Sequence, residues 1–596
     1  MRKGKRLFWM AATVVFAIGC MGAAFPAAAV ETHVSMEALA GGYRMFTLHG
    51  NSGAGSYGYR YGPSIMYYPG TDRADAWFAS PGKNDEWDWF TYRRTDNYST
   101  AASYADWTQE KLMLYPTPDS MDHYSVCDPG VVFFGGYYYI GYTSTIVSTN
   151  GGINNNCFVA RSRNPDGPFE KWNGGGWGGD PQPIFYYNET DAAWGAGELS
   201  FVELGGTLYC YYTWAGPGYT TTEVALADAT DENWPATLEH KGAAFVRDNG
   251  AGEDSWDVAY IEDCDKFVGF ATYNRFTASS GIAIYESDDG LTFTRAGVIR
   301  TGIYQHCHNM GISKRPNGHI NLAEDGDRLY IGYAFSAGSA DSWGRWATVF
   351  QPVRLFTYTG ALRDTDAGGV PTPSGDSYLN PAWPAVDPIG ISVNKHTVHM
   401  TSWPWSVLAN TFRVFSYDTY YTESNRGAGV TFSGYDRDLI ACVFRLGWPI
   451  NTWVILPRLC KTGETDVTIT YETGGRTFQN VMKVNVHGPR FRANPRQPRI
   501  ASFTNVPGQE SLTIYMNPAD GVTRRPQVRG LVAFENGAWG ESYAYPAAFA
   551  VTSGEAYIQV DNRGIVTPVA PGRATVTATM TDGCDTHSIE VEVVVV

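Results

Sequence analysis

The sequence predicts an all-β protein, a five-bladed β-propeller followed by two β-sandwich domains. No segment has the apolar periodicity of an amphipathic helix; short apolar runs are instead broken by Gly, Asn, Asp and Pro roughly every eight to twelve residues. One strand–turn–strand motif recurs five times along the first part of the chain. At 596 residues the chain is also too long to fold around one core, so several domains are expected.

The N-terminus has the three parts of a secretory signal. Basic residues between Arg2 and Arg6 precede an apolar stretch from Leu7 to Ile18, and Ala27 to Ala29 form a small-residue cleavage site. We therefore expect residues 1–29 to be a signal peptide and the mature protein to be secreted or held at a bacterial cell surface. The alternatives are a membrane anchor, for which the apolar run is short, and lipoprotein processing at Cys20. No membrane insertion is expected once the signal is removed.

The repeated motif is a short apolar strand, a turn and an aromatic-rich strand, followed by a third strand. Units two to four then carry a polar turn ahead of a further segment, which makes about four strands per unit. The five units begin at Gly62, Asp128, Glu198, Asp257 and His308, at spacings of 51 to 70 residues. Such a period is typical of propeller blades, so a five-bladed propeller is predicted over residues 41–360.

The first residues of the five units are expected to form a ring. The first strand of each propeller blade lines the central channel, and the heads of these strands meet at one mouth. Four of the five predicted heads are ionisable: Asp128, Glu198, Asp257 and His308. Because burying like charges is costly and paired carboxyls shift each other's pKa, this ring is a candidate functional site.

The chain changes character after the propeller. Residues 364–390 are rich in Pro and Gly and are predicted to be a linker. Short strands then fill residues 391–487 and 498–596, as expected for two β-sandwiches of roughly 100 residues each.

The amino-acid composition narrows the classes of binding partner. The net charge is −16 and no basic stripe is present, which argues against nucleic acid and anionic membranes. The 38 Tyr, 19 Trp and 29 Phe residues suit a poly- or oligosaccharide partner, or simply fill β-sheet cores. The cysteines lack C-x-x-C spacing and are expected to be mostly small buried side chains, with Cys442 and Cys460 as one candidate disulfide pair.

The propeller resembles the five-bladed furanosidase-type glycoside hydrolases of families 43, 32, 68 and 117. The resemblance rests on "DPGVVFFGGYYYIGYTS" from Asp128, the turn "GPFEKW" from Gly167, and the Glu198 strand with its "GGTLYCYYTW". The last segment, with "VDNRGIVTPVAPGRATVTATMTDG" from Val560, is similar to group 2 bacterial immunoglobulin-like domains. Residues 391–487 resemble the same class more faintly. The resemblance implies that these domains act as spacers or associate with the cell wall.

Family 43 implies a base Asp in blade one, a pKa-tuning Asp in blade two and an acid Glu in blade three. By position, Asp128 matches the tuning residue and Glu198 the acid, while Gly62 stands where the base should be. The family also implies an axial histidine in blade five that helps to hold calcium, which His308 matches. No cofactor is otherwise expected.

Glycoside hydrolysis needs two carboxyl groups across the scissile bond. We expect Glu198 to be the general acid, Asp257 or Asp128 to be the base of an inverting reaction, and the remaining aspartate to orient them; Asp88 is an alternative base. Loops between second and third strands return to the same mouth, and they supply the candidate substrate-binding residues. These are Trp87, Asp88, Asn155, Arg275, Trp343 and Arg345, together with His308.

The sequence thus predicts a secreted glycoside hydrolase that cleaves a poly- or oligosaccharide by carboxylate acid/base catalysis. The alternative is a non-catalytic carbohydrate-binding or adhesin-type surface propeller. Gly62 favours the alternative, and the acids of the other blades favour the enzyme.

Overall fold

The computed structural model of the chain describes residues in all three expected domains. The described residues are 31–46, 59–82, 86–117, 120–145, 154–187, 193–247, 252–336, 346–361, 368–372, 388–395, 397–402, 410–417, 423–447, 451–487, 500–506, 510–516, 525–534, 539–542, 547–562, 564–581 and 586–596. The predicted signal peptide lies outside them, as does most of the predicted linker. Within these ranges no helix has the length and apolar character needed to cross a membrane.

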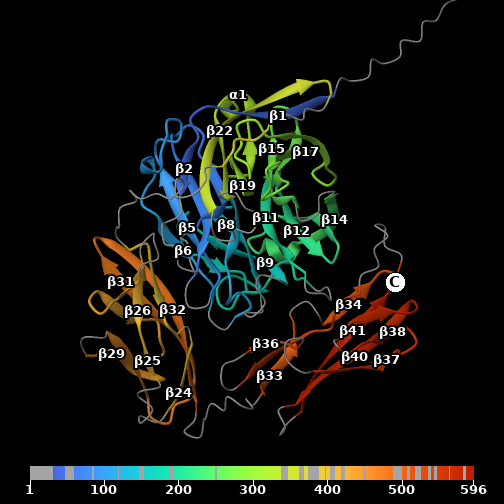
Figure 1. The fold of residues 1–596 in the computed structure, drawn as a ribbon. Coiled ribbons are helices and arrows are strands. Elements are labelled where there is room, and N and C mark those ends of the chain that lie inside the picture. The colour runs from blue at the N-terminus through green and yellow to red at the C-terminus, as the bar shows by residue number, and fades with distance from the viewer. Residues whose placement is uncertain are drawn as a thin grey trace, which may run out of the picture.

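The first part of the chain is a five-bladed β-propeller, as predicted (Figure 1). Each blade has four strands, and in blades one to four their order from the axis outward is the order of the chain. Blade one has β3 (Tyr61–Tyr67), β4 (Ala74–Pro81), β5 (Asp88–Thr95) and β6 (Lys111–Leu114); blade two has β7 (Cys127–Phe134), β8 (Tyr137–Thr145), β9 (Asn155–Ser162) and β10 (Glu170–Lys171). Blade three has β11 (Gly195–Leu204), β12 (Thr207–Gly216), β13 (Tyr219–Asp228) and β14 (Glu239–Val246); blade four has β15 (Asp254–Ile261), β16 (Lys266–Tyr273), β17 (Gly281–Ser287) and β18 (Thr294–Ile299).

Blade five is completed by the N-terminal end of the chain. It comprises β19 (Cys307–Lys314), β21 (Leu329–Ser336), β22 (Trp346–Thr359) and, as its outermost strand, β1 (Thr32–Ala38). The propeller therefore starts earlier than the predicted residue 41. The sequence motif could not reveal this strand, because β1 precedes the first unit and pairs with β22 more than 300 residues later.

Short elements lie between the blades. β2 (Tyr43–Phe46) also pairs with β22, and β20 (His319–Ile320) pairs in parallel with β15. The described helices are brief: the 3₁₀ turns η1 (Tyr104–Asp106) and η2 (Trp234–Thr237), and the single helical turn α1 (Leu322–Asp325).

Every inner strand carries a bulge near its head. The bulges leave one residue of each strand with a left-handed backbone: Gly62 (φ 56°), Asp128 (55°), Glu198 (56°), Ser255 (44°) and Asn309 (35°). A positive φ is unfavourable for residues other than glycine, so four of these positions hold strain. We call these five residues the bulge ring.

The residue two positions after each bulge joins its blade to the next. Oxygens of the Ser64, Ser200 and Asp257 side chains accept hydrogen bonds from the backbone N–H of Val131 (3.2 Å), Val258 (2.9 Å) and Ile312 (2.8 Å), respectively. These bonds cover the junctions from blade one to two, three to four, and four to five.

The two remaining junctions depend on glycine. A Cβ on Gly130 would lie 1.8 Å from the Leu199 carbonyl oxygen, and one on Gly311 would lie 1.9 Å from the Pro63 carbonyl oxygen. These inner strands approach so closely that only glycine fits. All five inner strands are thus locked around the axis.

Many aromatic side chains fill the propeller's interior. Trp77, Trp89, Trp234 and Trp346 are among the largest fully buried side chains. Much of the aromatic excess therefore serves packing, and composition alone is no evidence of sugar binding.

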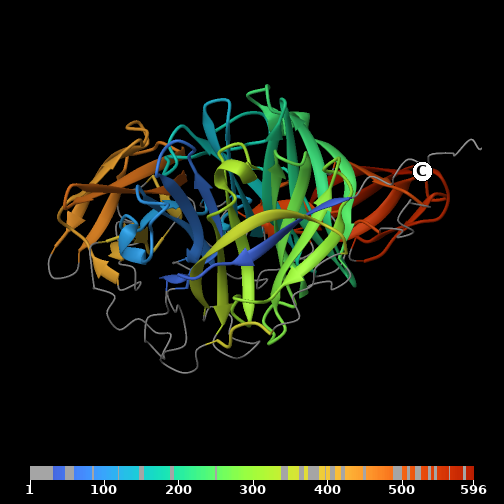
Figure 2. The same ribbon diagram turned by 90° about the horizontal axis from the view of Figure 1, so that it is seen from above.

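Two sheet-rich domains follow, on opposite sides of the propeller (Figures 1 and 2). The middle domain contains β23 (Gly390–Val393), β24 (Thr397–Thr401), β25 (Thr411–Phe412), β26 (Val414–Tyr417), β27 (Glu423–Asn425), β28 (Val430–Ser433), β29 (Ile440–Leu446), β30 (Thr452–Pro457), β31 (Gly463–Thr473) and β32 (Arg476–His487). The last domain contains β33 (Ile500–Asn505), β34 (Ser511–Ile514), β35 (Gly530–Phe534), β36 (Trp539–Glu541), β37 (Ala548–Ser553), β38 (Ile558–Val560), β39 (Val566–Pro568), β40 (Gly572–Thr581) and β41 (Thr586–Val595).

The two domains share one plan. Each has a four-stranded sheet, ordered β24-β32-β31-β28 in the middle domain and β34-β41-β40-β37 in the last. In both, an early strand pairs in parallel with the final strand, and the other pairs are antiparallel. Each also has its own cluster of buried apolar side chains, so each has a core of its own.

The cysteines that the structure describes are all free. Cys442 and Cys460, the candidate disulfide pair, are not bonded to each other. Cys442 lies on β29 and Cys460 in an exposed turn after β30, so that pairing prediction is wrong. Four of the others, Cys127, Cys157, Cys210 and Cys307, are buried, as expected of small apolar side chains.

We expect truncation of β1 side chains to destabilise the propeller, because β1 closes blade five. Met36 on β1 is 2 % exposed, so Met36→Ala should lower the free energy of unfolding by roughly 2–5 kcal/mol in urea titrations followed by tryptophan fluorescence. The matched control is Glu37→Gln on the same strand, whose side chain is 45 % exposed and which should change stability little. Equal effects of the two changes would contradict the closing role of β1.

Candidate active site

A pocket of about 280 Å³ opens at the mouth where the inner strands begin. Its lining residues come from blades one to five: Tyr61, Trp87, Asp88, Tyr124, Ser125, Cys127, Asp128, Thr143, Thr145, Asn155, Trp194, Glu198, Arg275, His308 and Asn309. Three of them carry carboxyl groups, Asp88, Asp128 and Glu198. The pocket thus combines aromatic walls with a few convergent polar groups, as small-molecule sites commonly do.

The bulge ring places Asp128 and Glu198 in this pocket, as the sequence predicted for both. The other ring positions are Gly62, Ser255 and Asn309, so the predicted ring members Asp257 and His308 were each misplaced by one or two residues. The position of the bulge explains both errors. In blade four the bulged residue is Ser255, ahead of the apolar run, and in blade five it is Asn309, directly after His308. His308 still reaches the pocket from its position beside Asn309.

Glu198 is held by donors from two strands, β12 and β15. Its Oε2 accepts hydrogen bonds from Thr213 Oγ1 (2.5 Å) and from the Ser255 backbone N–H (3.2 Å). Arg247 Nη2 donates in turn to Thr213 Oγ1 at 2.6 Å. Two donors on one oxygen, with a guanidinium behind them, stabilise a carboxylate.

Asp88 begins β5, the third strand of blade one, and is buried. Its two oxygens accept hydrogen bonds from Tyr59 Oη (2.5 Å) and Tyr61 Oη (3.0 Å). Burial raises the pKa of Asp88 to about 8; the two tyrosine hydroxyls lower it, and the charge of Asp128 raises it further. This shift favours the protonated form of Asp88 at neutral pH. Asp88 provides the carboxyl group of blade one at the pocket, because Gly62 has no side chain.

Asp128 lies between these two groups in the order of the blades. Its Oδ1 accepts a hydrogen bond from Asn309 Nδ2 at 3.0 Å, across the axis. Its left-handed backbone turns it out of the regular ladder of β7, whose pairing with β8 shifts between Cys127 and Gly130.

Asp257 does not belong to this pocket. It lines a smaller hollow of about 20 Å³, which Asp128 and Glu198 also line. Its Oδ1 accepts hydrogen bonds from Lys314 Nζ (2.5 Å) and Ser200 Oγ (2.9 Å), and its Oδ2 bonds the Ile312 amide. Asp257 thus joins its blade to the next, as Ser64 and Ser200 do, and Lys314 neutralises its charge. These contacts give Asp257 a structural role, and its predicted catalytic role stays a prediction.

The rim residues that the structure describes lie where the loop argument predicted. Trp87, Asn155 and Arg275, from the loops or strand ends of blades one, two and four, all line the pocket. Trp343 and Arg345, predicted for blade five, lie outside the described residues.

His308 is packed among aromatic rings. Its imidazole lies 4.5 Å from the Phe276 ring, 4.6 Å from Trp346 and 5.6 Å from Tyr61, between ring centroids. Calcium binds six to eight oxygen ligands, which these neighbours do not supply. In the described part of the chain no group of three or more His, Cys, Asp and Glu side chains is arranged around a metal position. Calcium binding at His308 stays a prediction.

Two features of the pocket were not predicted from the sequence. Trp194 lines the wall ahead of β11, and Tyr59 and Tyr61 hold Asp88. The sequence contained a signal for the tyrosines that hold Asp88, because Tyr61 directly precedes the ring residue Gly62.

The last domain contacts the segment that leads to Trp194. Arg529 is 1 % exposed, and its Nη1 donates to the Tyr187 carbonyl at 3.1 Å. The Tyr187 amide donates to Asn156 Oδ1 at 2.8 Å, and the neighbouring Asn155 bonds the Trp194 carbonyl through both its backbone and side-chain nitrogens. One wall of the pocket is therefore tied to the last domain through a short chain of hydrogen bonds.

No family model and no curated protein matches this sequence. Solved structures that resemble it include a family 117 glycoside hydrolase from the marine bacterium Zobellia galactanivorans, at 13 % identity over 54 % of this chain and 90 % of that one (TM-score 0.36). A thermostable family 43 glycoside hydrolase has 15 % identity over 55 % and 99 % (TM-score 0.34). An α-L-arabinofuranosidase from Podospora anserina, in complex with cellotriose, has 10 % identity over 52 % and 96 % (TM-score 0.34). These likenesses are too loose to assign an activity.

We expect Asp257 and Lys314 to behave as one structural unit. Asp257→Ser keeps an oxygen for the Ile312 amide but leaves the Lys314 ammonium, 4 % exposed, without its carboxylate, which should cost about 3–5 kcal/mol in urea unfolding. The double variant Asp257→Ser/Lys314→Met removes the stranded charge and should recover most of that loss. No recovery in the double variant would contradict the pairing.

Asp88 should make the fold less stable as pH rises. In the unfolded chain its pKa is near 3.8, whereas in the folded chain it is about 8, so between these values only the unfolded chain releases the proton. Stability is thus lost progressively over this range and the deficit stays constant above it. Asp88→Asn should raise the melting temperature, with a gain that is small near pH 4 and largest above pH 8. A gain independent of pH would contradict the raised pKa.

Proposed function

We propose that this protein is a glycoside hydrolase whose reaction takes place in the mouth pocket. The observation that carries the proposal is that two carboxyl groups line one pocket: Asp88, whose pKa burial raises to about 8, and Glu198, which is held by two donors. Hydrolysis of a glycosidic bond needs one carboxyl group as proton donor and one carboxylate as base or nucleophile. The aromatic walls at Trp87 and Trp194 suit the apolar faces of a sugar.

We assign the proton donor to Asp88 and the base to Glu198, the reverse of the role expected for Glu198 from sequence. Asp88 keeps its proton up to about pH 8 because it is buried beside Asp128. The donors on Glu198 Oε2 favour a carboxylate that can take a proton from water. Asp128 acts as the tuning group that helps to hold the Asp88 proton.

An inverting course fits this arrangement. Asp88 and Glu198 come from blades one and three, with blade two between them, which favours the wider separation that admits a water molecule. The substrate is then a poly- or oligosaccharide, and the sugar released first carries the inverted anomeric configuration. The protein is secreted or attached to the bacterial surface. Its immunoglobulin-like domains act as spacers, a role inferred from fold-level analogy.

The roles can be separated with two kinds of substrate. Reducing-sugar release is measured over a panel of polysaccharides, and turnover is measured on aryl glycosides with activated leaving groups. Asp88→Asn should abolish polysaccharide cleavage, at least 100-fold in kcat/KM, but spare much of the aryl glycoside turnover, because a good leaving group needs no proton. Glu198→Ala should lose both activities and regain turnover with added azide or formate. The parent's kcat/KM should fall above about pH 8, as Asp88 loses its proton.

The folded double variant Asp257→Ser/Lys314→Met is the control, since it should keep parental activity. If this double variant were folded but inactive, Asp257 would have to be counted among the catalytic residues. Swapped behaviour of Asp88→Asn and Glu198→Ala would reverse the proposed roles of acid and base. Binding of polysaccharide without turnover, unaffected by either change, would favour the alternative of a non-catalytic carbohydrate-binding or adhesin-type propeller.

A further inference from the structure

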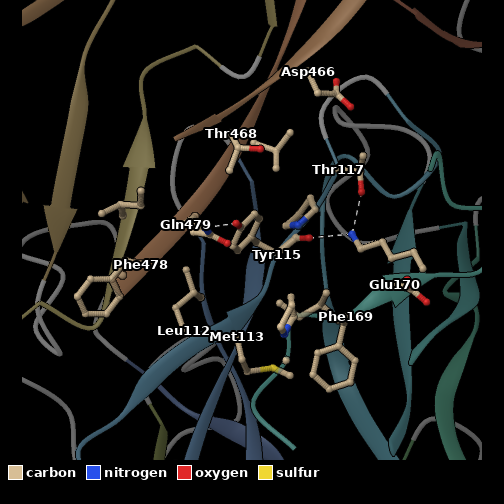
Figure 3. Close-up of a pocket in the computed structure, with 18 of the residues that line it drawn as sticks. Leu112, Met113, Tyr115, Thr117, Phe169, Glu170, Asp466, Thr468, Phe478 and Gln479 are labelled. Atoms are coloured by element: carbon tan, nitrogen blue, oxygen red, sulfur yellow. Dashed lines mark hydrogen bonds between the residues drawn. The ribbon is translucent and has the colours of Figure 1, made fainter. Parts of the chain in front are cut away.

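A second, larger cleft lies between the propeller and the middle domain (Figure 3). Its volume is about 630 Å³, within the range of ligand sites, and it shares none of its lining residues with the mouth pocket. One wall is formed by the end of β6 and the segment around β10; the other is the outer face of β31 and β32.

The walls of the cleft are fixed relative to each other. Tyr115 Oη donates to the Gln479 carbonyl at 2.5 Å, and Arg476 Nη2 donates to the Glu110 carbonyl at 3.0 Å. Beside these bonds, Trp89 and Leu112 of the propeller pack with Ile389 and Tyr417 in one buried cluster. The cleft is thus formed by two walls that direct contacts between the propeller and the middle domain hold together.

The propeller wall is itself ordered by a buried lysine. Lys171 Nζ donates to the Tyr115 carbonyl (2.8 Å) and to Thr117 Oγ1 (3.0 Å), and also pairs with Asp122. These bonds hold the segment from Tyr115 to Thr117 in place, and the half-buried Phe169 ring lies on the same wall (Figure 3).

The two walls differ in chemistry. The propeller side presents the rings of Tyr115 and Phe169, and the domain side presents hydroxyl, amide and carboxyl groups of Thr468, Gln479 and Asp466 (Figure 3). A ligand with a flat apolar face and an edge of hydroxyl groups would satisfy both walls at once.

The charges around the cleft argue against an anionic ligand. Lys111 pairs with Asp166 at 2.8 Å, and Lys483 pairs with Asp180 at 3.5 Å, which also links the two domains. Lys171 is neutralised by Asp122. With each of these lysines facing a carboxylate, the cleft offers no surplus positive charge to a phosphate or an acidic peptide.

We propose that this cleft is a second carbohydrate-binding site, which takes an uncharged stretch of a polysaccharide chain. One face of a sugar ring stacks on Phe169, and its hydroxyl groups bond to Thr468 and Gln479. The site holds polymer next to the propeller, and it functions whether or not the mouth pocket is catalytic.

The test is affinity electrophoresis of the full chain in native gels containing soluble arabinan, xylan or mannan. Glu198→Gln is used as the parent in these gels, so that any turnover does not remove the polymer. Phe169→Ala should weaken retardation about five- to tenfold in apparent Kd, since stacking on one ring is lost. Thr468→Trp, which fills the cleft from the opposite wall, should weaken it at least as much.

Phe444→Ala is the matched control, because Phe444 is an exposed aromatic residue of the middle domain (39 % exposed) outside the cleft lining. It should migrate like the parent. Parental retardation of both cleft variants would overturn the proposal, as would absence of retardation of the parent in all three polymers. Retardation lost only in Trp87→Ala would assign binding to the mouth pocket and overturn it too. Turnover of aryl glycosides, measured without Glu198→Gln, should be unchanged by Phe169→Ala, which keeps this test separate from that of the proposed function.

Discussion

Five contacts between inner strands at the propeller axis constrain both the closure of the propeller and the direction of the ring side chains. At each junction, the residue two positions after the bulge either bonds the next strand through a side-chain oxygen or is a glycine that lets the next carbonyl approach. The bulge ahead of each contact turns one residue into the left-handed region and toward the mouth. The same local geometry therefore closes the propeller and presents Asp128 and Glu198 to the pocket.

This constraint explains why acidic residues near the axis have unlike roles. Asp257 stands at a junction position, where its carboxylate bonds a backbone amide and Lys314. Asp128 and Glu198 stand on the bulge ring and reach the pocket. Asp88 comes from outside the ring, from the third strand of blade one, and lies under two tyrosine hydroxyls. Position relative to the bulge thus separates Asp257 from Asp128 and Glu198, whereas Asp88 reaches the pocket from another strand.

The fold class and two ring acids could be predicted from sequence, because the strand–turn–strand repeat is local and regular. Asp257 and His308 were misaligned because the repeat aligns the units on their apolar runs, and a bulge does not alter such a run. A local signal was available: the third residue of each unit, counted from the true ring position, is small or oxygen-bearing, namely Ser64, Gly130, Ser200, Asp257 and Gly311. Strand β1, the interdomain cleft and the raised pKa of Asp88 depend on contacts between distant segments, which no local pattern records.

Asp88 and Asp128 share one buried environment, and Asp88 supplies the carboxyl group that Gly62 lacks. The most direct measurement is an infrared titration of the full chain that follows the carbonyl stretch of a protonated carboxylic acid, with Asp88→Asn as the reference. We expect a band that belongs to Asp88 and disappears near pH 8. In Asp128→Asn it should disappear at lower pH, because the neighbouring charge is gone. Loss of the band near pH 4, or a midpoint that Asp128→Asn leaves unchanged, would contradict this expectation.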